Sequence, residues 1–97
     1  MLDRDLHPTE GARFLLELER EHSGRAHYRA SIYTPESVFT GALTLDDRGG
    51  TELVATGAPA ELDDRLRSIA KLVARDAAKR VADGLPAWPS RILRWRR

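Results

Sequence analysis

The fold is decided by residues 59–83, which read PAELDDRLRSIAKLVARDAAKRVAD. Apolar side chains recur in this stretch at the three- and four-residue spacing that places them on one face of an α-helix. Pro59 suits a first helical turn, acidic residues follow at positions 61, 63 and 64, and Gly84 with Pro86 provides a stop signal. The sequence therefore predicts one helix over residues 59–83, about 37 Å long at roughly 1.5 Å per residue. Its apolar stripe consists of Leu62, Leu66, Ile69, Ala70, Val73, Ala77 and Val81.

Before the helix, residues 12–56 show the two-residue alternation of β-strands. Turn signals at residues 22–24 (HSG), 35–36 (PE) and 46–50 (DDRGG) divide this region into four segments. We therefore expect a four-stranded antiparallel meander with one apolar face. That face consists of Phe14, Leu16, Leu18, Ala26, Tyr28, Ala30, Ile32, Phe39, Gly41, Leu43, Leu45, Leu53 and Ala55.

The first hairpin has one register that satisfies both faces of the sheet. A three-residue loop over residues 22–24, with Gly24 in the left-handed conformation, keeps the apolar side chains opposite one another. A two-residue loop would set Leu18 against Arg29 and is disfavoured. The predicted pairs are Glu21 with Arg25, Glu19 with His27, Leu18 with Tyr28, Glu17 with Arg29, Leu16 with Ala30 and Phe14 with Ile32.

The next two hairpins continue the same apolar face. Pro35 suits a type I turn in which Thr34 faces Ser37. This register pairs Ile32 with Phe39, Ala30 with Gly41, Tyr28 with Leu43 and Ala26 with Leu45. A five-residue loop before the fourth segment keeps Leu53 and Ala55 inside, whereas a four-residue loop would bury Val54 and Glu52. We attribute the small residue at position 41 to close approach of the crossing helix.

These elements predict an α+β fold in a single domain over residues 1–97. An N-terminal segment (1–11) precedes a four-stranded antiparallel β-meander (12–56), one long C-terminal α-helix (59–83) packed on one sheet face, and a Trp/Arg-rich tail (85–97). Because short strands span only about 17–20 Å, part of the helix stripe should overhang the sheet. Two elements could cover the overhanging part of the stripe, and both could do so together. One is the helix of a second copy in a homodimer, and the other is the tail, folding back with Leu85, Trp88, Ile92, Leu93 and Trp95.

The composition excludes several classes of protein. The chain has no cysteine, so a disulfide scaffold, a thiolate metal site and a cysteine nucleophile are excluded. No apolar run approaches the roughly 20 residues of a membrane span, and the charged first residues do not resemble a secretory signal. We therefore expect a cytoplasmic protein without a membrane span.

The net charge of +1 conceals a strong polarity along the chain. Residues 1–64 carry 6 Arg and 13 Asp or Glu, a net charge of −7, whereas residues 65–97 carry 10 Lys or Arg and 2 Asp, a net charge of +8. Such asymmetry suits an anionic partner, or attraction between an acidic and a basic half within or between subunits.

No pattern in the sequence predicts catalysis or a cofactor. His7, His22 and His27 lack the spacing of metal ligands, and the expected sheet places His27 in an ordinary cross-strand pair. The DDRGG stretch lacks the ligand spacing of a calcium loop and the Gly-Lys-Ser/Thr of a phosphate loop, so we interpret it as a hairpin turn. We therefore expect that the protein is not an enzyme and binds neither a metal ion nor a cofactor.

Basic residues form the candidate binding surface. On a helix, Arg67, Lys71, Arg75 and Lys79 recur every fourth residue and make one ridge away from the apolar stripe. The tail adds cations and two indoles, and its candidate residues are Trp88, Arg91, Arg94, Trp95, Arg96 and Arg97. The structural alternative for the helix residues is an ordinary solvated face. For the tail, it is that the arginines pair with the acidic half of the chain and the two indoles pack on the core.

Two functional hypotheses follow. The first is a small non-enzymatic interaction module, a homodimer whose basic helix face and tail bind an acidic protein partner. The second is a nucleic-acid-binding protein in which these cations contact phosphates and Trp88 or Trp95 stacks on a base.

Overall fold

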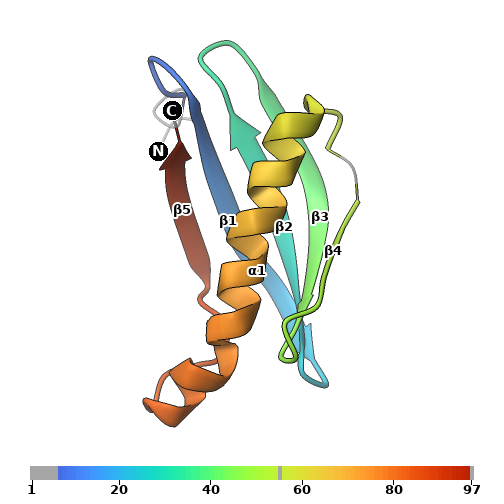
Figure 1. Cartoon of the computed structure of the whole chain (residues 1–97), viewed down its shortest axis with the longest axis vertical. Helices are drawn as coiled ribbons and strands as arrows, with labels where there is room; N and C mark the ends of the chain where they lie inside the picture. Colours follow the sequence, from blue (N-terminus) through green and yellow to red (C-terminus); the bar gives the residue numbers. More distant parts are fainter. Residues whose placement is uncertain (1–6, 55, 97) are drawn as a thin grey trace.

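The computed structural model describes residues 7–54 and 56–96. One antiparallel sheet has the strand order β4-β3-β2-β1-β5, and one long helix crosses one of its faces (Figure 1). The elements are β1 (Ala12–His22), β2 (Arg25–Tyr33), β3 (Val38–Asp46), β4 (Thr51–Leu53), α1 (Ala60–Ala82) and β5 (Arg91–Arg96). The α+β class and the order of strands and helix are confirmed, but the sheet has five strands where four were predicted.

The β1–β2 hairpin keeps the predicted pairs in its middle and differs at its tip. Leu18 lies opposite Tyr28, as predicted, and the other predicted pairs, nearer the start of β1, are also present. The turn, however, has two residues, Ser23 and Gly24, with φ angles of 51° and 78°, and the ladder shifts between Leu18 and Arg20. A turn with two positive φ angles matches the twist of the flanking strands, and a bulge restores the register of the apolar side chains.

The three-residue loop was therefore wrong, because a two-residue turn combined with one bulge satisfies the same apolar pattern. The same shift removes the predicted pairs of Glu21 with Arg25 and Glu19 with His27. Their places are taken by pairs of His22 with Arg25, Glu21 with Ala26 and Arg20 with His27.

The β2–β3 and β3–β4 hairpins follow the predicted registers. Between β2 and β3, every predicted pair is present, and the Thr34 amide donates to the Ser37 carbonyl at 2.9 Å. Between β3 and β4, Leu45 lies opposite Thr51 and Leu43 opposite Leu53, as the five-residue loop requires. The predicted burial of Ala55 lies outside the described residues.

Gly41 allows a close approach, but of a different segment from the one expected. A Cβ atom on Gly41 would stand 2.7 Å from the carbonyl oxygen of Val54 and 2.8 Å from the Thr56 methyl. The chain leaving β4 therefore passes over this position, and the prediction that α1 does so was wrong. The amide of Val54 donates to the Ala42 carbonyl at 2.9 Å, which holds that segment against β3.

Helix α1 agrees with the predicted range to within one residue at each end and is unbroken. Of the predicted stripe, Leu66, Ile69, Ala70 and Ala77 are buried, while Leu62 and Val73 are partly buried. Val81 is 60% exposed, contrary to the prediction, because the last turn of α1 extends beyond the sheet (Figure 1). Ala74, which the predicted stripe omitted, is buried.

Both ends of α1 are fixed by hydrogen bonds. At the start, the Thr56 hydroxyl donates to the buried Asp63 carboxylate at 2.7 Å and accepts from the Ala58 amide at 3.1 Å. At the end, Gly84 adopts a φ of 80°, and the Leu85 amide donates to the Arg80 carbonyl at 2.8 Å. Gly84 therefore ends the helix in the left-handed conformation, which glycine adopts without strain.

The tail folds back on the sheet as an additional strand. β5 pairs with β1, and the ladder continues where the Leu18 amide donates to the Ser90 carbonyl at 2.9 Å. Trp88 and Ile92 are each 5% exposed and belong to the main core. The Tyr28 hydroxyl donates to the Pro89 carbonyl at 2.7 Å. The predicted cover by the tail is therefore met only by Trp88 and Ile92, whereas Leu85, Leu93 and Trp95 are exposed because β5 lies at the sheet edge and does not follow the end of α1. Dimerisation stays a prediction.

Removal of the Tyr28 hydroxyl tests this anchor. Tyr28→Phe leaves the Pro89 carbonyl without its donor, and we expect the free energy of unfolding to fall by about 1–2 kcal/mol in urea titrations. Burial raises the pKa of Tyr28 from 10.0 to about 12, with the Arg80 charge opposing that shift. The folded state thus holds the phenolic proton more tightly than the unfolded state does.

The contribution of Tyr28 should consequently be complete below pH 10 and decline as the pH rises towards about 12. The difference in unfolding free energy between the wild type and Tyr28→Phe should shrink over that interval. A difference that stays constant, or wild-type stability in the variant at neutral pH, would show that the hydroxyl does not anchor the tail.

Candidate functional site

The first group of predicted binding residues lies on α1. This basic ridge, Arg67, Lys71, Arg75 and Lys79, follows the helix on its solvent side. Arg67 is paired with Asp64, its Nη1 3.1 Å from the carboxylate Oδ1, at a largely solvated site. Such an exposed pair contributes little stability. Within the part of the chain that the structure describes, the other three cations form no ion pair.

The ridge leans towards one edge of the sheet. The Cγ atom of Arg75 lies 4.0 Å from where a Cβ on Gly49 would stand, so this cation is beside the β3–β4 turn. β4 is the last strand at that edge. Like charges at four-residue spacing repel one another, and a bound anion would relieve that repulsion.

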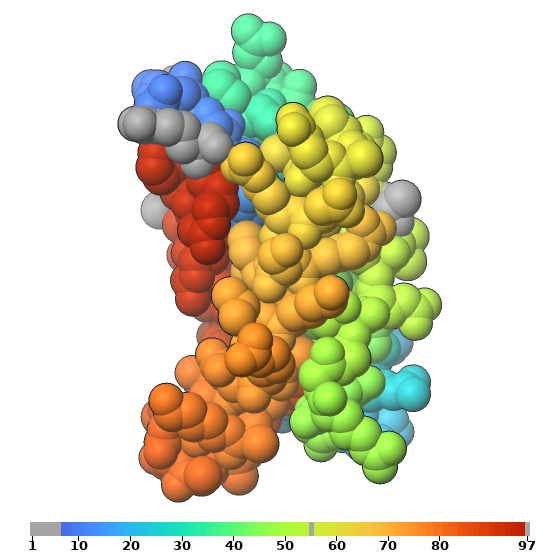
Figure 2. Space-filling model, in the orientation of Figure 1, coloured from blue at the N-terminus to red at the C-terminus, as the bar shows by residue number. Residues whose placement is uncertain are grey.

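The second group lies on β5, at the opposite edge of the sheet. Arg91, Arg94 and Arg96 are exposed, and Arg97 lies outside the described residues. Figure 2 shows β5 and the first half of α1 as separate ridges on this side of the molecule. The structure thus divides the predicted binding surface between two elements, α1 and β5 (Figure 1).

The two indoles have different environments. Trp88 is 5% exposed and packs in the core, which agrees with the alternative in which this indole has a structural role and does not contact a partner. Trp95 is 43% exposed, and its Nε1 donates to the Glu10 carbonyl at 3.1 Å. Trp95 is therefore the more exposed of the two indoles.

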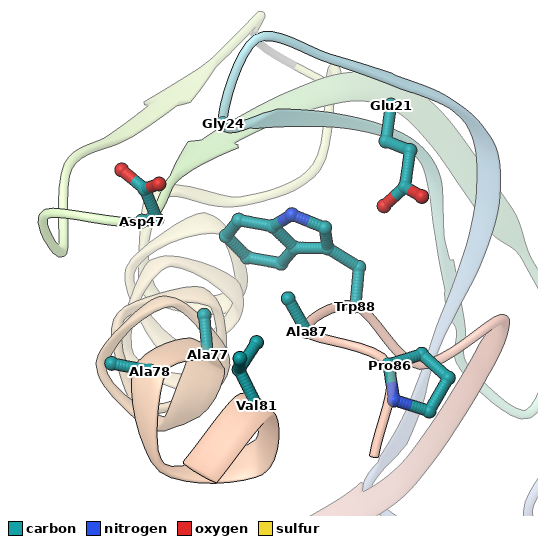
Figure 3. Close-up of a pocket in the computed structure, with 9 residues that line it drawn as sticks. All are labelled: Glu21, Gly24, Asp47, Ala77, Ala78, Val81, Pro86, Ala87 and Trp88. Atoms are coloured by element: carbon teal, nitrogen blue, oxygen red, sulfur yellow. The ribbon is translucent and has the colours of Figure 1, made fainter. Parts of the chain in front are cut away.

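A cavity of about 460 Å³ lies where the end of α1 meets the tips of two hairpins. Figure 3 shows the Trp88 indole against Ala77 and Ala87, with Glu21 and Asp47 on its two sides. The lining consists of Glu21, Gly24, Asp47, Ala77, Ala78, Val81, Pro86, Ala87 and Trp88. Apart from the carboxylates of Glu21 and Asp47, these residues carry no ionisable or hydroxyl side chain, so the cavity offers apolar contact beside two acidic groups.

The DDRGG segment forms a hairpin turn, as interpreted from the sequence. Oδ1 of Asp46 accepts the amide N–H of Gly50 at 2.8 Å and that of Arg48 at 2.9 Å. These two hydrogen bonds, that from Gly50 first, lower the pKa of the Asp46 carboxyl. Oδ1 of Asp46 therefore stabilises the turn through both of these hydrogen bonds.

His7 and His27 likewise have local partners. His7 Nδ1 lies 2.6 Å from the Thr34 carbonyl oxygen, and its ring meets that of Tyr33 edge to face at 5.2 Å. His27 Nδ1 lies 3.3 Å from the Thr44 hydroxyl. Within residues 7–54 and 56–96, no three His, Asp or Glu side chains are grouped so that they could hold a metal ion.

Comparison with known protein families, with curated proteins and with solved structures finds no match for this chain. Of the helices in the described ranges, none has the length and apolarity needed to cross a membrane.

Sequence patterns located the cations but missed how β5 presents them. The guanidinium Nη1 of Arg94 donates to the Leu93 carbonyl, and that of Arg96 to the Trp95 carbonyl, both at 2.9 Å. The sequence gives little signal for this arrangement, because arginine and an apolar residue alternate only over residues 93–96.

Proposed function

We propose that this protein is a non-enzymatic interaction module that binds an acidic protein partner through the basic ridge of α1 and the arginines of β5. The observation that supports this most is how few of these cations take part in ion pairs. Apart from Arg67, those in the described residues form no ion pair, although the chain carries 15 acidic residues. Their charge is available to a partner.

Electrostatic complementarity gives such a surface its specificity and its rate of association. Among the described residues, the acidic half of the chain pairs with these cations only through Asp64 and Arg67. Glu17, for example, lies opposite Arg29 on one side and Arg91 on the other, and no ion pair joins it to either. Arginines on β5 add planar, fork-shaped donors that suit carboxylates.

Nucleic-acid binding is the second candidate, and one observation favours it: the exposed Trp95 indole stands between Arg94 and Arg96 along β5. Stacking on an aromatic ring beside cations is typical of single-strand binding. Two other observations favour the protein partner. Trp88 is buried, and the two groups of cations lie on separate elements, with β5 at one edge of the sheet and Arg75 of the ridge beside the β3–β4 turn near the other.

Titration of labelled ligands separates the two candidates. We expect a Glu-rich peptide to bind at low salt and to weaken as salt is raised, with single- and double-stranded oligonucleotides binding less tightly. Neutralising the β5 arginines (R91Q, R94Q and R96Q together) or three ridge residues (K71Q, R75Q and K79Q together) should each weaken peptide binding by about ten-fold or more.

A charge-matched control uses three exposed arginines outside both surfaces, R20Q, R25Q and R48Q together. This variant should bind the peptide within about two-fold of the wild type. If all three variants lose affinity equally, only net charge matters and neither surface is a site. Tighter binding of an oligonucleotide than of the peptide would replace the first candidate by the second.

The proposal includes a homodimer, which the apolar end of α1 supports. Val81 is 60% exposed and Leu85 is 49% exposed, and both lie where the helix passes beyond the sheet. A second copy that buried both would gain about 1 kcal/mol for each side chain, since each is already about half buried.

We expect a solution mass of twice 10.9 kDa by light scattering, and a mass of one chain for the double variant V81E/L85E. Since both positions are exposed, the variant should keep its helical circular dichroism. A single-chain mass for the wild type would contradict the dimer.

A further inference from the structure

The cavity between the end of α1 and the tips of the two hairpins has polar groups that no described residue satisfies. Its volume of about 460 Å³ lies in the range of small-molecule sites. The carboxylates of Glu21 and Asp47 stand on two sides of it (Figure 3). Neither carboxylate forms a hydrogen bond or an ion pair with a described residue. Both are therefore available to a ligand in the cavity.

Trp88 contributes a third unsatisfied group. The residue is 5% exposed, and its Nε1 has no hydrogen-bond acceptor among the described residues. This nitrogen is still in contact with solvent, because no fully buried side-chain nitrogen or oxygen of the described residues lacks a partner. Figure 3 shows it on the edge of the ring nearer the Gly24 turn, away from Ala77. Since a buried indole N–H usually finds an acceptor, an oxygen in the cavity would complete this group.

The rest of the lining is mostly small and apolar. Ala77, Ala78 and Ala87 lie beside the indole, so an aliphatic chain can cross it without a clash (Figure 3). The face of an indole also attracts a cation. Arg80 does not neutralise the carboxylates, since its Nε donates to the Pro86 carbonyl at 2.7 Å. The cavity therefore combines an apolar floor with two unpaired negative charges and one free donor.

These unsatisfied groups determine which occupant fits. An anion would be repelled by the two carboxylates. A second copy offers the exposed apolar side chains of Val81 and Leu85, which would leave both carboxylates and the indole N–H without partners, and burial of unpaired polar groups is costly. A cation that carries both an apolar stem and an acceptor oxygen satisfies all three groups.

We infer that this cavity binds a small organic cation in which an apolar stem joins an ammonium group to a hydrogen-bond-accepting oxygen. The ammonium group lies beside Glu21 and Asp47, the stem covers the floor, and the oxygen accepts from Nε1 of Trp88. This site is separate from the basic ridge and from β5, so the inference goes beyond the proposed function and does not depend on it.

Fluorescence of Trp88 provides a direct measurement of binding. The chain has two tryptophans, so Trp95→Phe leaves Trp88 as its only indole. The probe is 6-aminohexanamide, in which a methylene chain joins an ammonium group to an amide. At low salt we expect a saturable change in Trp88 fluorescence, with a Kd of about 1 mM or less that calorimetry reproduces. Hexanamide lacks the charge and hexylammonium lacks the oxygen, and each should bind about five-fold more weakly or worse.

Two variants, made in the Trp95→Phe chain, test the location of the site. E21Q/D47N removes both charges at nearly constant size, and A78F fills the cavity from an exposed position on α1. We expect each to weaken binding of the probe by about five-fold or more. The matched controls are E17Q/E36Q and A60F, at exposed positions outside the cavity lining, and they should stay within about two-fold of the parent chain.

Circular dichroism and thermal unfolding establish that the variants fold. Unchanged binding by folded E21Q/D47N or A78F would overturn the inference, and so would the absence of saturable binding of 6-aminohexanamide. Equal binding of hexylammonium would contradict the role of the indole N–H, and equal binding of hexanamide would assign the cavity to an apolar occupant such as a second copy. None of these results bears on the binding of a Glu-rich peptide, so the proposed function is tested separately.

Discussion

The antiparallel pairing of β5 with β1 is the interaction on which the rest of the structure depends. It converts β1 from an edge strand into an interior strand, and it brings Trp88 and Ile92 into the core that α1 and the sheet share. The Tyr28 hydroxyl and the Leu18 amide bind the segment that leads into β5, through Pro89 and Ser90. A domain this small has little apolar surface to bury, so a tail that contributes two buried side chains is a substantial part of its stability.

This pairing also determines where charge is displayed. A free basic tail could reach the acidic half of its own chain, whereas β5 holds its arginines along one edge of the sheet. The basic ridge remains on α1, beside the other edge, where Arg75 lies over the β3–β4 turn. The structure therefore presents two basic surfaces, and the one on β5 combines cations with main-chain hydrogen-bonding groups.

Much of the fold could be predicted from local patterns. Alternation over residues 12–56 fixed the pairing of Leu18 with Tyr28 and of Ile32 with Phe39, because a shift of one residue would expose the whole apolar set. The bulge after Leu18 could not be predicted, since a three-residue loop and a two-residue loop with a bulge leave the same side chains inside. Val81 follows the helical period, but its exposure depends on where the sheet ends.

β5 was missed for a different physical reason. The segment RILRWR places cations on both faces and buries only Ile92, so it lacks the alternation of a strand with one apolar face. Its partner, β1, is more than sixty residues earlier in the chain. The spacing of Arg67, Lys71, Arg75 and Lys79 predicted a ridge correctly, whereas the edge formed by β5 depends on this distant pairing.

Amide hydrogen exchange measured residue by residue tests the pairing of β5 with β1 most directly. The account predicts slow exchange at Ile92 and Arg94, whose amides face β1, and fast exchange at Arg91 and Leu93, whose amides face the free edge. Equally fast exchange at all four amides would show that the tail is not part of the sheet.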